Sequence, residues 1–257
     1  MVPAAAAVEL IHLATLYHDD VMDEAALRRG APSANARWDN TVAILTGDFL
    51  FARASGLLAD LGPEAVRIQA RTFERLVKGQ IRETVGPGSG EDAISHYLAV
   101  LADKTGSLIA TSARYGALMA GADAATVEVV TAYGEALGMA FQLADDLLDV
   151  VGDQTQVGKV PGTDLREGVA TLPVLLARAG SDPGDARLRA LLDSDLSDDT
   201  RHAEALELLR VHPAIPAARA ELYRWVDQAR SALTPLPDGA ARNAMVALCD
   251  VVGARLR

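Results

Sequence analysis

Apolar residues recur every three or four positions in long segments through the first 150 residues of the chain. This spacing places apolar side chains on one face of an α-helix and differs from the strict alternation of a half-buried strand. Proline and glycine separate these segments, and no stretch has a convincing strand pattern. We therefore predict an all-α protein with helices over residues 4–24, 36–60, 64–84, 91–120 and 124–150.

The composition supports close helix packing around one core. Half of the residues are apolar and only 4% are aromatic, with alanine and leucine dominant. Alanine and leucine favour helices, whereas strands favour β-branched and aromatic residues. A chain of this length can bury one sizeable core, so we expect a single domain over residues 1–257.

The charge balance, the cysteine count and the apolar stretches limit the ligands and the cellular location that we expect. The net charge is −11, with 35 acidic against 24 basic residues, which argues against nucleic acid and means that metal would have to bridge a bound phosphate. The single cysteine, Cys249, permits no internal disulfide and favours the cytoplasm. The apolar N-terminal stretch lacks the basic region of a signal peptide. Charges such as Arg53 and Glu135 interrupt the apolar stretches, so we expect no transmembrane segment.

One aspartate-rich pattern occurs twice. It is DDVMD at Asp19, Asp20 and Asp23, and DDLLD at Asp145, Asp146 and Asp149. Residues four positions apart share a helix face, so each motif directs two carboxylates the same way. Both motifs lie near the C-terminal end of an apolar helix, where the negative end of the helix dipole makes them destabilising.

Divalent cations would remove that destabilisation. Magnesium binds one or two carboxylates and keeps positions for water and phosphate oxygens, so two facing clusters would hold a diphosphate. One such triplet is equally well explained as a solvated helix end, but two together favour the metal site.

Basic residues follow the first motif and recur on a later helix. Arg28 and Arg29 come directly after the carboxylates, and the planar guanidinium group suits diphosphate oxygens. Lys104 and Thr105 follow Tyr97 by two helical turns and offer a charge and a hydroxyl from one helix. Taken alone, each pair is typical of an ordinary protein surface.

A glycine-containing loop follows the second motif. Lys159 lies between Gly158 and Gly162, and the spacing of Asp164 and Glu167 is that of a capping box at a helix start. A lysine before a helix N-terminus is a plausible phosphate contact, although the spacing matches no P-loop. Pro173 should interrupt the helix that begins there.

Five motifs together resemble a known family. They are DDVMDEAALRRG, GDFLFARA, KTGSL, FQLADDLLD and GKVPGTDLREGVATLP, in that order between Ala7 and Pro173. As a set they resemble the trans-isoprenyl diphosphate synthases, or polyprenyl synthetases. The resemblance implies an isoprenoid synthase-type helical bundle around a central cavity, with the two motifs across its mouth and three Mg²⁺ ions between them. It also implies a homodimer.

The resemblance implies a role for each matching residue. The principal magnesium ligands would be Asp19, Asp23 and Asp145. Asp20, Asp146 and Asp149 would support them directly or through water. Arg28 would bind the allylic diphosphate and Arg29 isopentenyl diphosphate. The allylic diphosphate site would be completed by Lys104, Thr105, Gln142 and Lys159. The catalytic residues would be the two lysines together with Asp19, Asp23 and Asp145. Asp48 would support the metal ligands of the first motif without binding the metal itself.

The implied reaction is prenyl transfer. An allylic diphosphate ionises, the double bond of isopentenyl diphosphate attacks the cation, and a proton is eliminated. In this family, bulky aromatic residues one turn before the first motif look like the floor of the cavity, which stops growth of the prenyl chain at short products. Ala14 and Thr15 are small, so we expect a product of geranylgeranyl length or longer.

Two departures from the family pattern stand out. The helices that normally carry a Gly-Lys-x-x-Arg-Pro motif and a histidine do not precede this segment, so we expect an N-terminally truncated domain with half of the acceptor site missing. Val169 stands where the family often has a diphosphate-binding lysine. The alternatives are a non-catalytic or regulatory subunit of a heteromeric synthase, and a terpene cyclase. The intact triplets argue against the first, and DDLLD argues against the second.

Overall fold

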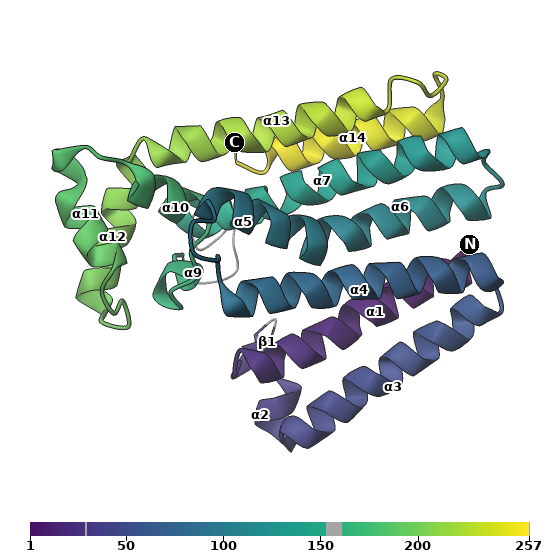
Figure 1. The fold of residues 1–257 in the computed structure, drawn as a ribbon, viewed down its shortest axis with the longest axis horizontal. Helices are drawn as coiled ribbons and strands as arrows, with labels where there is room; N and C mark the ends of the chain where they lie inside the picture. Colours follow the sequence, from purple (N-terminus) through teal and green to yellow (C-terminus); the bar gives the residue numbers. More distant parts are fainter. Residues whose placement is uncertain (29, 153–160, 257) are drawn as a thin grey trace. The chain divides into compact units, whose positions relative to one another are not determined.

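The computed structural model describes residues 1–28, 30–152 and 161–256 (Figure 1). It is almost entirely helical, which confirms the all-α prediction. The chain forms two compact units, of which the first comprises Met1–Arg75 with Ala110–Thr131. The second comprises Leu76–Ile109 with Ala132–Arg257. The expectation of a single domain stays a prediction.

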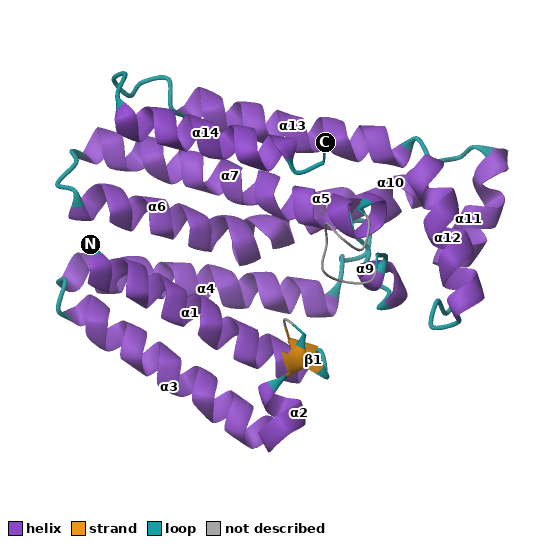
Figure 2. Ribbon diagram, turned by 180° about the vertical axis from the view of Figure 1, so that it is seen from behind, coloured by secondary structure: helices purple, strands orange, loops and turns teal. Residues whose placement is uncertain are grey.

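Two long helices form the side of the first unit that carries DDVMD. Helix α1 (Val2–Met22) and helix α3 (Asn40–Ala59) lie side by side (Figures 1 and 2). The buried residues of both helices are mostly small, as at Ala7, Ala14 and Gly47. Small side chains allow two helix backbones to approach closely.

A short hairpin connects these helices. Strands β1 (Leu27–Arg28) and β2 (Ala31–Pro32) pair antiparallel, and Gly30, in the turn between them, has a positive φ of 78°. The sequence contained no strand signal because each strand has only two residues. The expectation of no strand is therefore wrong for this hairpin.

The helix predicted over residues 36–60 is divided into two. Helix α2 (Ala34–Trp38) ends at Asp39, whose φ of 99° is outside the helical region. The Asp39 side chain then accepts a hydrogen bond from the backbone N–H of Val42 at 3.0 Å and caps the start of α3. Aspartate is a favoured N-cap residue, so the break stabilises the second helix.

Three helices contribute residues to both units. They are α4 (Pro63–Val85), α6 (Ser107–Met119) and α7 (Ala124–Val151). The other elements of the second unit are α5 (Ala93–Leu101), the π-helical turn η1 (Ala102–Gly106), α9 (Thr163–Arg166), α10 (Leu172–Ala179), the 3₁₀ turn η2 (Pro183–Asp185), α11 (Ala186–Leu192), α12 (Asp199–Val211), α13 (Ala214–Ala232) and α14 (Ala240–Ala254).

Helix α7 supplies much of the core of the second unit. Met139, Leu143 and Leu147 recur at four-residue spacing and are each 1% exposed. They belong to one apolar cluster with residues of α13 and α14, which lie beside α7 (Figures 1 and 2). Tyr133 of α7 also donates a hydrogen bond to the carbonyl of Met245 in α14 at 3.0 Å. This packing fixes the helix that carries DDLLD.

The helix predicted over residues 91–120 contains the π-helical turn η1. Its last residue, Gly106, packs against Gly138 of α7, where an added Cβ at Gly138 would lie 2.8 Å from the Gly106 Cα. The two glycines therefore let the backbones touch. Turns of this kind are rare and often occur at functional sites. This one contains Lys104 and Thr105.

Helix α3 departs from the expectation that charges interrupt every apolar stretch. Asn40–Ala59 is long and apolar enough to cross a membrane, with a mean hydropathy of 1.5 and 22% of that stretch buried. Length and composition alone are weak evidence for a membrane span, because buried core helices share them. The helix does present large apolar side chains to solvent, since Leu45 and Phe49 are 61% and 62% exposed.

Candidate active site

The first motif divides into exposed and buried carboxylates. Asp19 is half-buried and Asp23 is exposed at the C-terminal cap of α1, whereas Asp20 is only 4% exposed. Nε and Nη2 of Arg28 lie 2.7 and 2.5 Å from Oδ1 of Asp20. A buried charge requires such a partner. Asp20 therefore positions Arg28, while Arg29 lies outside the described residues.

Asp48 approaches the first motif through a histidine. Nε2 of His18 lies 3.1 Å from the carbonyl oxygen of Ile44 and 3.5 Å from Oδ1 of Asp48. The His18 ring lies against Gly47, where a Cβ would overlap it. These contacts give His18 a hydrogen-bonding and packing role and explain the glycine in GDFLFARA.

The second motif divides in the same way. Asp145 is exposed, but Asp146 and Asp149 are each 6% exposed. The Asp149 carboxylate accepts hydrogen bonds of 3.1 Å from the backbone N–H groups of Thr163 and Asp164. Asp149 therefore caps helix α9.

This cap replaces the predicted capping box. The N-cap residue of α9 is Gly162, with a φ of 78° and no side-chain hydrogen bond, and the helix ends at Arg166. Pro173 lies in the first turn of α10, where a missing backbone N–H costs little. The expectation that Asp164 and Glu167 form a capping box, with Pro173 interrupting the same helix, is therefore wrong.

Asp146 is the centre of a hydrogen-bonded chain of side chains. Tyr97 of α5 donates its hydroxyl to Asp146, and Nε2 of Gln142 donates to the other carboxylate oxygen at 2.9 Å. Thr105 in turn donates to Oε1 of Gln142 at 3.0 Å. Burial raises the pKa of Asp146 to about 6, hydrogen bonds from Tyr97 and Gln142 oppose this shift, and the charges of Asp145 and Asp149 add to it. Thr105 and Gln142 are thus brought together by a hydrogen bond.

Replacing Tyr97 by phenylalanine is expected to lower the free energy of unfolding by about 1.5–3 kcal/mol above the pKa of Asp146, because a buried carboxylate loses a hydrogen-bond donor. The matched control is Tyr133→Phe, which removes a hydroxyl bonded to a neutral carbonyl. That loss should cost about 0.5–1.5 kcal/mol. Urea unfolding of both variants measures the difference, and equal losses would contradict the charged bond.

Lys104 lies on η1 and is paired. Its ammonium group contacts the carboxylate of Glu83 in α4, and its stem passes the backbone of Gly79, where a Cβ would be 2.9 Å from the lysine Cγ. Lysine is a compact charge on a flexible stem, so it can exchange one oxygen partner for another. The other predicted lysine, Lys159, lies outside the described residues.

Sequence reasoning missed one residue beside the second motif. Arg255, at the C-terminal end of α14, places Nη2 at 3.1 Å from Oδ1 of Asp145. Its guanidinium carbon lies 4.8 Å from the centre of the Phe141 ring. No local pattern connects Arg255 with a motif 110 positions away.

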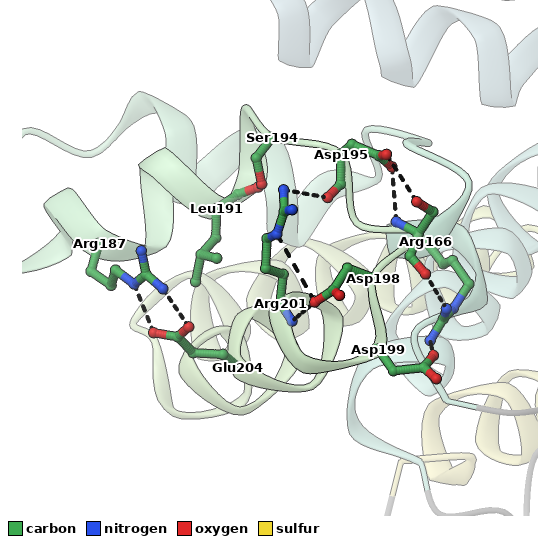
Figure 3. A network of polar contacts seen from close by, with 10 residues as sticks. Arg166, Arg187, Leu191, Ser194, Asp195, Asp198, Asp199, Arg201 and Glu204 are labelled. Atoms are coloured by element: carbon green, nitrogen blue, oxygen red, sulfur yellow. Dashed lines mark hydrogen bonds and ion pairs between the residues drawn. The ribbon is translucent and has the colours of Figure 1, made fainter.

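Val169, where the family often has lysine, is 46% exposed and lines a pocket of about 190 Å³. Arg166 and Arg178 also line this pocket. Figure 3 shows Arg166 beside Asp199. Nη2 of Arg166 lies 2.9 Å from Oδ1 of Asp199, and its Nη1 donates to the Ser197 carbonyl at 3.0 Å. These contacts tie α9 to the start of α12.

Ion pairs also join the neighbouring helices. Arg187 and Glu204 form a paired contact between α11 and α12 (Figure 3). Nε of Arg178 lies 3.4 Å from Asp193. The arginines around Val169 therefore have structural partners.

The donor set of the two motifs fits a hard divalent cation. Among residues 1–28, 30–152 and 161–256, no three His, Cys, Asp or Glu side chains gather as a metal-binding group. Each motif by itself therefore offers part of a coordination sphere. Magnesium suits such partial sets, because it takes one or two carboxylates and completes its octahedron with water and phosphate oxygens.

Comparisons with known proteins identify the family of this chain. The sequence profile described as polyprenyl synthetase matches residues 1–209. The chain is 53% identical to the nonaprenyl diphosphate synthase of Mycobacterium tuberculosis over 252 residues, which cover 98% of this chain and 75% of that protein. The fold matches geranylgeranyl pyrophosphate synthase from Corynebacterium glutamicum, solved with calcium and isoprenyl diphosphate, at a TM-score of 0.88 and 48% identity over 99% of this chain and 77% of the other.

A second solved structure gives the same result. The decaprenyl diphosphate synthase of Rhodobacter capsulatus superimposes at a TM-score of 0.89 with 37% identity, over 100% of this chain and 79% of the other. The fold and these relatives together define a prenyltransferase with the all-α isoprenoid synthase fold. More narrowly, the chain belongs to the polyprenyl synthetase family.

Proposed function

We propose that this chain condenses isopentenyl diphosphate with an allylic diphosphate to form a prenyl diphosphate of geranylgeranyl length or longer. The observation that carries the proposal is the presence of two intact aspartate triplets, each with exposed and buried carboxylates, in a member of the polyprenyl synthetase family. A chain that had lost catalysis would have no need to keep six carboxylates near helix ends, where they are unfavourable.

The roles that we propose for the six aspartates follow the burial of their side chains. Asp19, Asp23 and Asp145 would hold Mg²⁺, with three ions expected, while Asp20, Asp146 and Asp149 position their neighbours. When bound, the metal neutralises the charge that develops on the departing diphosphate. Lys104 would exchange Glu83 for a diphosphate oxygen.

The remaining substrate contacts are assigned by motif. Arg28, together with Arg29 and Lys159, would donate to the two diphosphates. Thr105 acts through Gln142, which it orients by a hydrogen bond. An apolar surrounding would protect the allylic cation from water.

The residues below the first motif support a medium or long product. Ala14 is completely buried in α1, and the hydroxyl of Thr15 donates to the carbonyl of His12 at 2.8 Å. Neither side chain has the volume of an aromatic floor. The relation to a nonaprenyl diphosphate synthase is consistent with this proposal.

The decisive test is a chain-length assay. The protein is incubated with Mg²⁺, labelled isopentenyl diphosphate and a series of allylic primers, and the products are sized. Magnesium-dependent lengthening of a primer supports the proposal. Cyclised hydrocarbon without isopentenyl incorporation would instead identify a terpene cyclase. Activity only after addition of another synthase chain would identify a regulatory subunit.

We further propose that the protein is a cytoplasmic homodimer and that the exposed face of α3 is its interface. The exposed side chains Val42, Leu45, Phe49, Ala52 and Gly56 recur at alternating spacings of three and four. This spacing is that of an apolar seam between two helices. A dimer interface would therefore explain the exposed apolar residues of α3 without membrane insertion.

The charges on α3 favour a second copy as the occupant. Asp48 and Arg53 are exposed near the middle of the helix. If two copies of α3 cross antiparallel between these positions, each Asp48 faces the Arg53 of the second copy. A two-fold interface requires such self-complementarity.

Phe49→Glu is expected to convert the dimer to monomer, because it places two glutamates in the centre of the apolar seam. The matched control is Val211→Glu on α12, where a large apolar side chain is 83% exposed. Sedimentation velocity distinguishes the two states. A Phe49→Glu protein that remains dimeric would exclude α3 as the interface.

A further inference from the structure

The guanidinium group of Arg255 contacts Asp145, the exposed carboxylate of the second motif. Its Nη2 lies 3.1 Å from Oδ1 of Asp145, and the side chains of Arg255 and Asp145 are 29% and 54% exposed. Asp145 is also the carboxylate of this motif that the proposed function assigns to metal. The guanidinium group therefore occupies an oxygen that a divalent cation would need.

The arginine is held from two sides, but its pairing is incomplete. Its guanidinium group stacks on the ring of Phe141, four positions before Asp145 on α7. Its Nη1 is buried and has no hydrogen-bond partner among the described residues. A partly exposed pair with one close contact is weak, typically worth a factor of about five or less in an equilibrium.

We propose that Arg255 is a positioning residue that holds Asp145 in the absence of metal and must release it before a divalent cation binds. The inference rests on the proposed function, because Asp145 is a metal ligand only there. While the pair is formed, the positive charge of Arg255 prevents repulsion between Asp145 and its neighbouring carboxylates. When metal binds, the divalent charge replaces that of the guanidinium group.

Stacking on Phe141 makes this exchange possible at small cost. A guanidinium group that leaves Asp145 can remain over the aromatic ring, where the attraction to the ring face persists. Because the charge stays nearby, it continues to oppose the approach of a cation. Arg255 therefore sets the metal affinity of Asp145.

The test measures metal binding directly. Binding of Mn²⁺ is followed by the loss of its free electron-paramagnetic-resonance signal, with and without inorganic pyrophosphate, for the wild type and for Arg255→Gln. The variant is expected to bind Mn²⁺ about threefold to fivefold more tightly, since the competing charge is gone. This difference should shrink at high salt.

Two further variants control for structure. Arg230→Gln removes a similar pair, in which Nη2 lies 2.7 Å from Asp250, and should leave the Mn²⁺ affinity unchanged. Arg255→Lys retains the charge and should stay within about twofold of the wild type. A purely structural role predicts a lower melting temperature for Arg255→Gln without tighter binding.

The outcomes separate this inference from the proposed function. Asp145→Asn must weaken Mn²⁺ binding if the second motif holds metal. If it does not, the proposed metal site fails and the role of Arg255 fails with it. If Asp145→Asn weakens binding but folded Arg255→Gln binds Mn²⁺ no more tightly than the wild type, only the role of Arg255 is overturned.

Discussion

Replacing Asp19 by asparagine is expected to lower kcat at least about a hundredfold while changing the free energy of unfolding by no more than about 1 kcal/mol. Asparagine keeps the shape of the side chain but removes the charge that would bind metal. Asp19 lies in the last turn of α1, close to the negative end of the helix dipole. Removing a negative charge there stabilises a helix by about 0.3–1 kcal/mol.

A large loss of turnover with little change in stability distinguishes a functional carboxylate from a structural one. Steady-state prenyl transfer and thermal unfolding are measured on the same preparation of Asp19→Asn. Asp227→Asn on α13 is the control, because Asp227 is exposed and distant in sequence from both motifs. Unchanged turnover in Asp19→Asn would remove Asp19 from the site, and reduced stability would show that its carboxylate has a structural role.

Gly138→Ala is expected to lower the free energy of unfolding by about 1–3 kcal/mol, because the new Cβ overfills a close helix contact. The added atom would lie 2.8 Å from the Gly106 Cα and 3.3 Å from its nitrogen, and backbone atoms cannot rotate away as a side chain can. The displaced segment is η1, which carries Lys104 and Thr105. Affinity for the allylic substrate should therefore fall as well.

A second glycine provides the matched control. Gly116 lies within α6, and a Cβ built there meets nothing within 4 Å. Gly116→Ala should stabilise the protein by about 0.4–1 kcal/mol, because alanine reduces the freedom of the unfolded chain. Denaturant unfolding of the two variants should give changes of opposite sign. A neutral Gly138→Ala would mean that α7 and η1 separate without cost.

The period of the apolar residues was enough to predict the long helices. Helix α1 and helix α7 begin and end within two residues of the predicted bounds, and the two aspartate motifs lie in their C-terminal turns. These features depend on local spacing, which the sequence displays directly. The aspartate at position 39 is a favoured cap, so the start of α3 also had a local signal.

The features that sequence reasoning missed depend on contacts between distant segments. Asp149 caps α9 from 14 residues away, so the spacing within α9 itself was misleading. Arg255 reaches Asp145 from 110 residues away. Gly106, at the end of the π-helical turn, meets Gly138 of a separate helix. Local propensity contains no information on any of these partners.

The π-helical turn makes the length of its segment as important as its residues. Tyr97, which precedes this turn, contacts Asp146 of α7, and Gly106, the last residue of the turn, contacts Gly138 of α7. Loss of one residue between them would turn one end by about 100° against the other, since an α-helix has about 3.6 residues per turn. Only one of the two contacts could then survive. The number of residues in Ala102–Gly106 is therefore constrained by geometry, in addition to the roles of Lys104, Thr105 and Gly106 themselves.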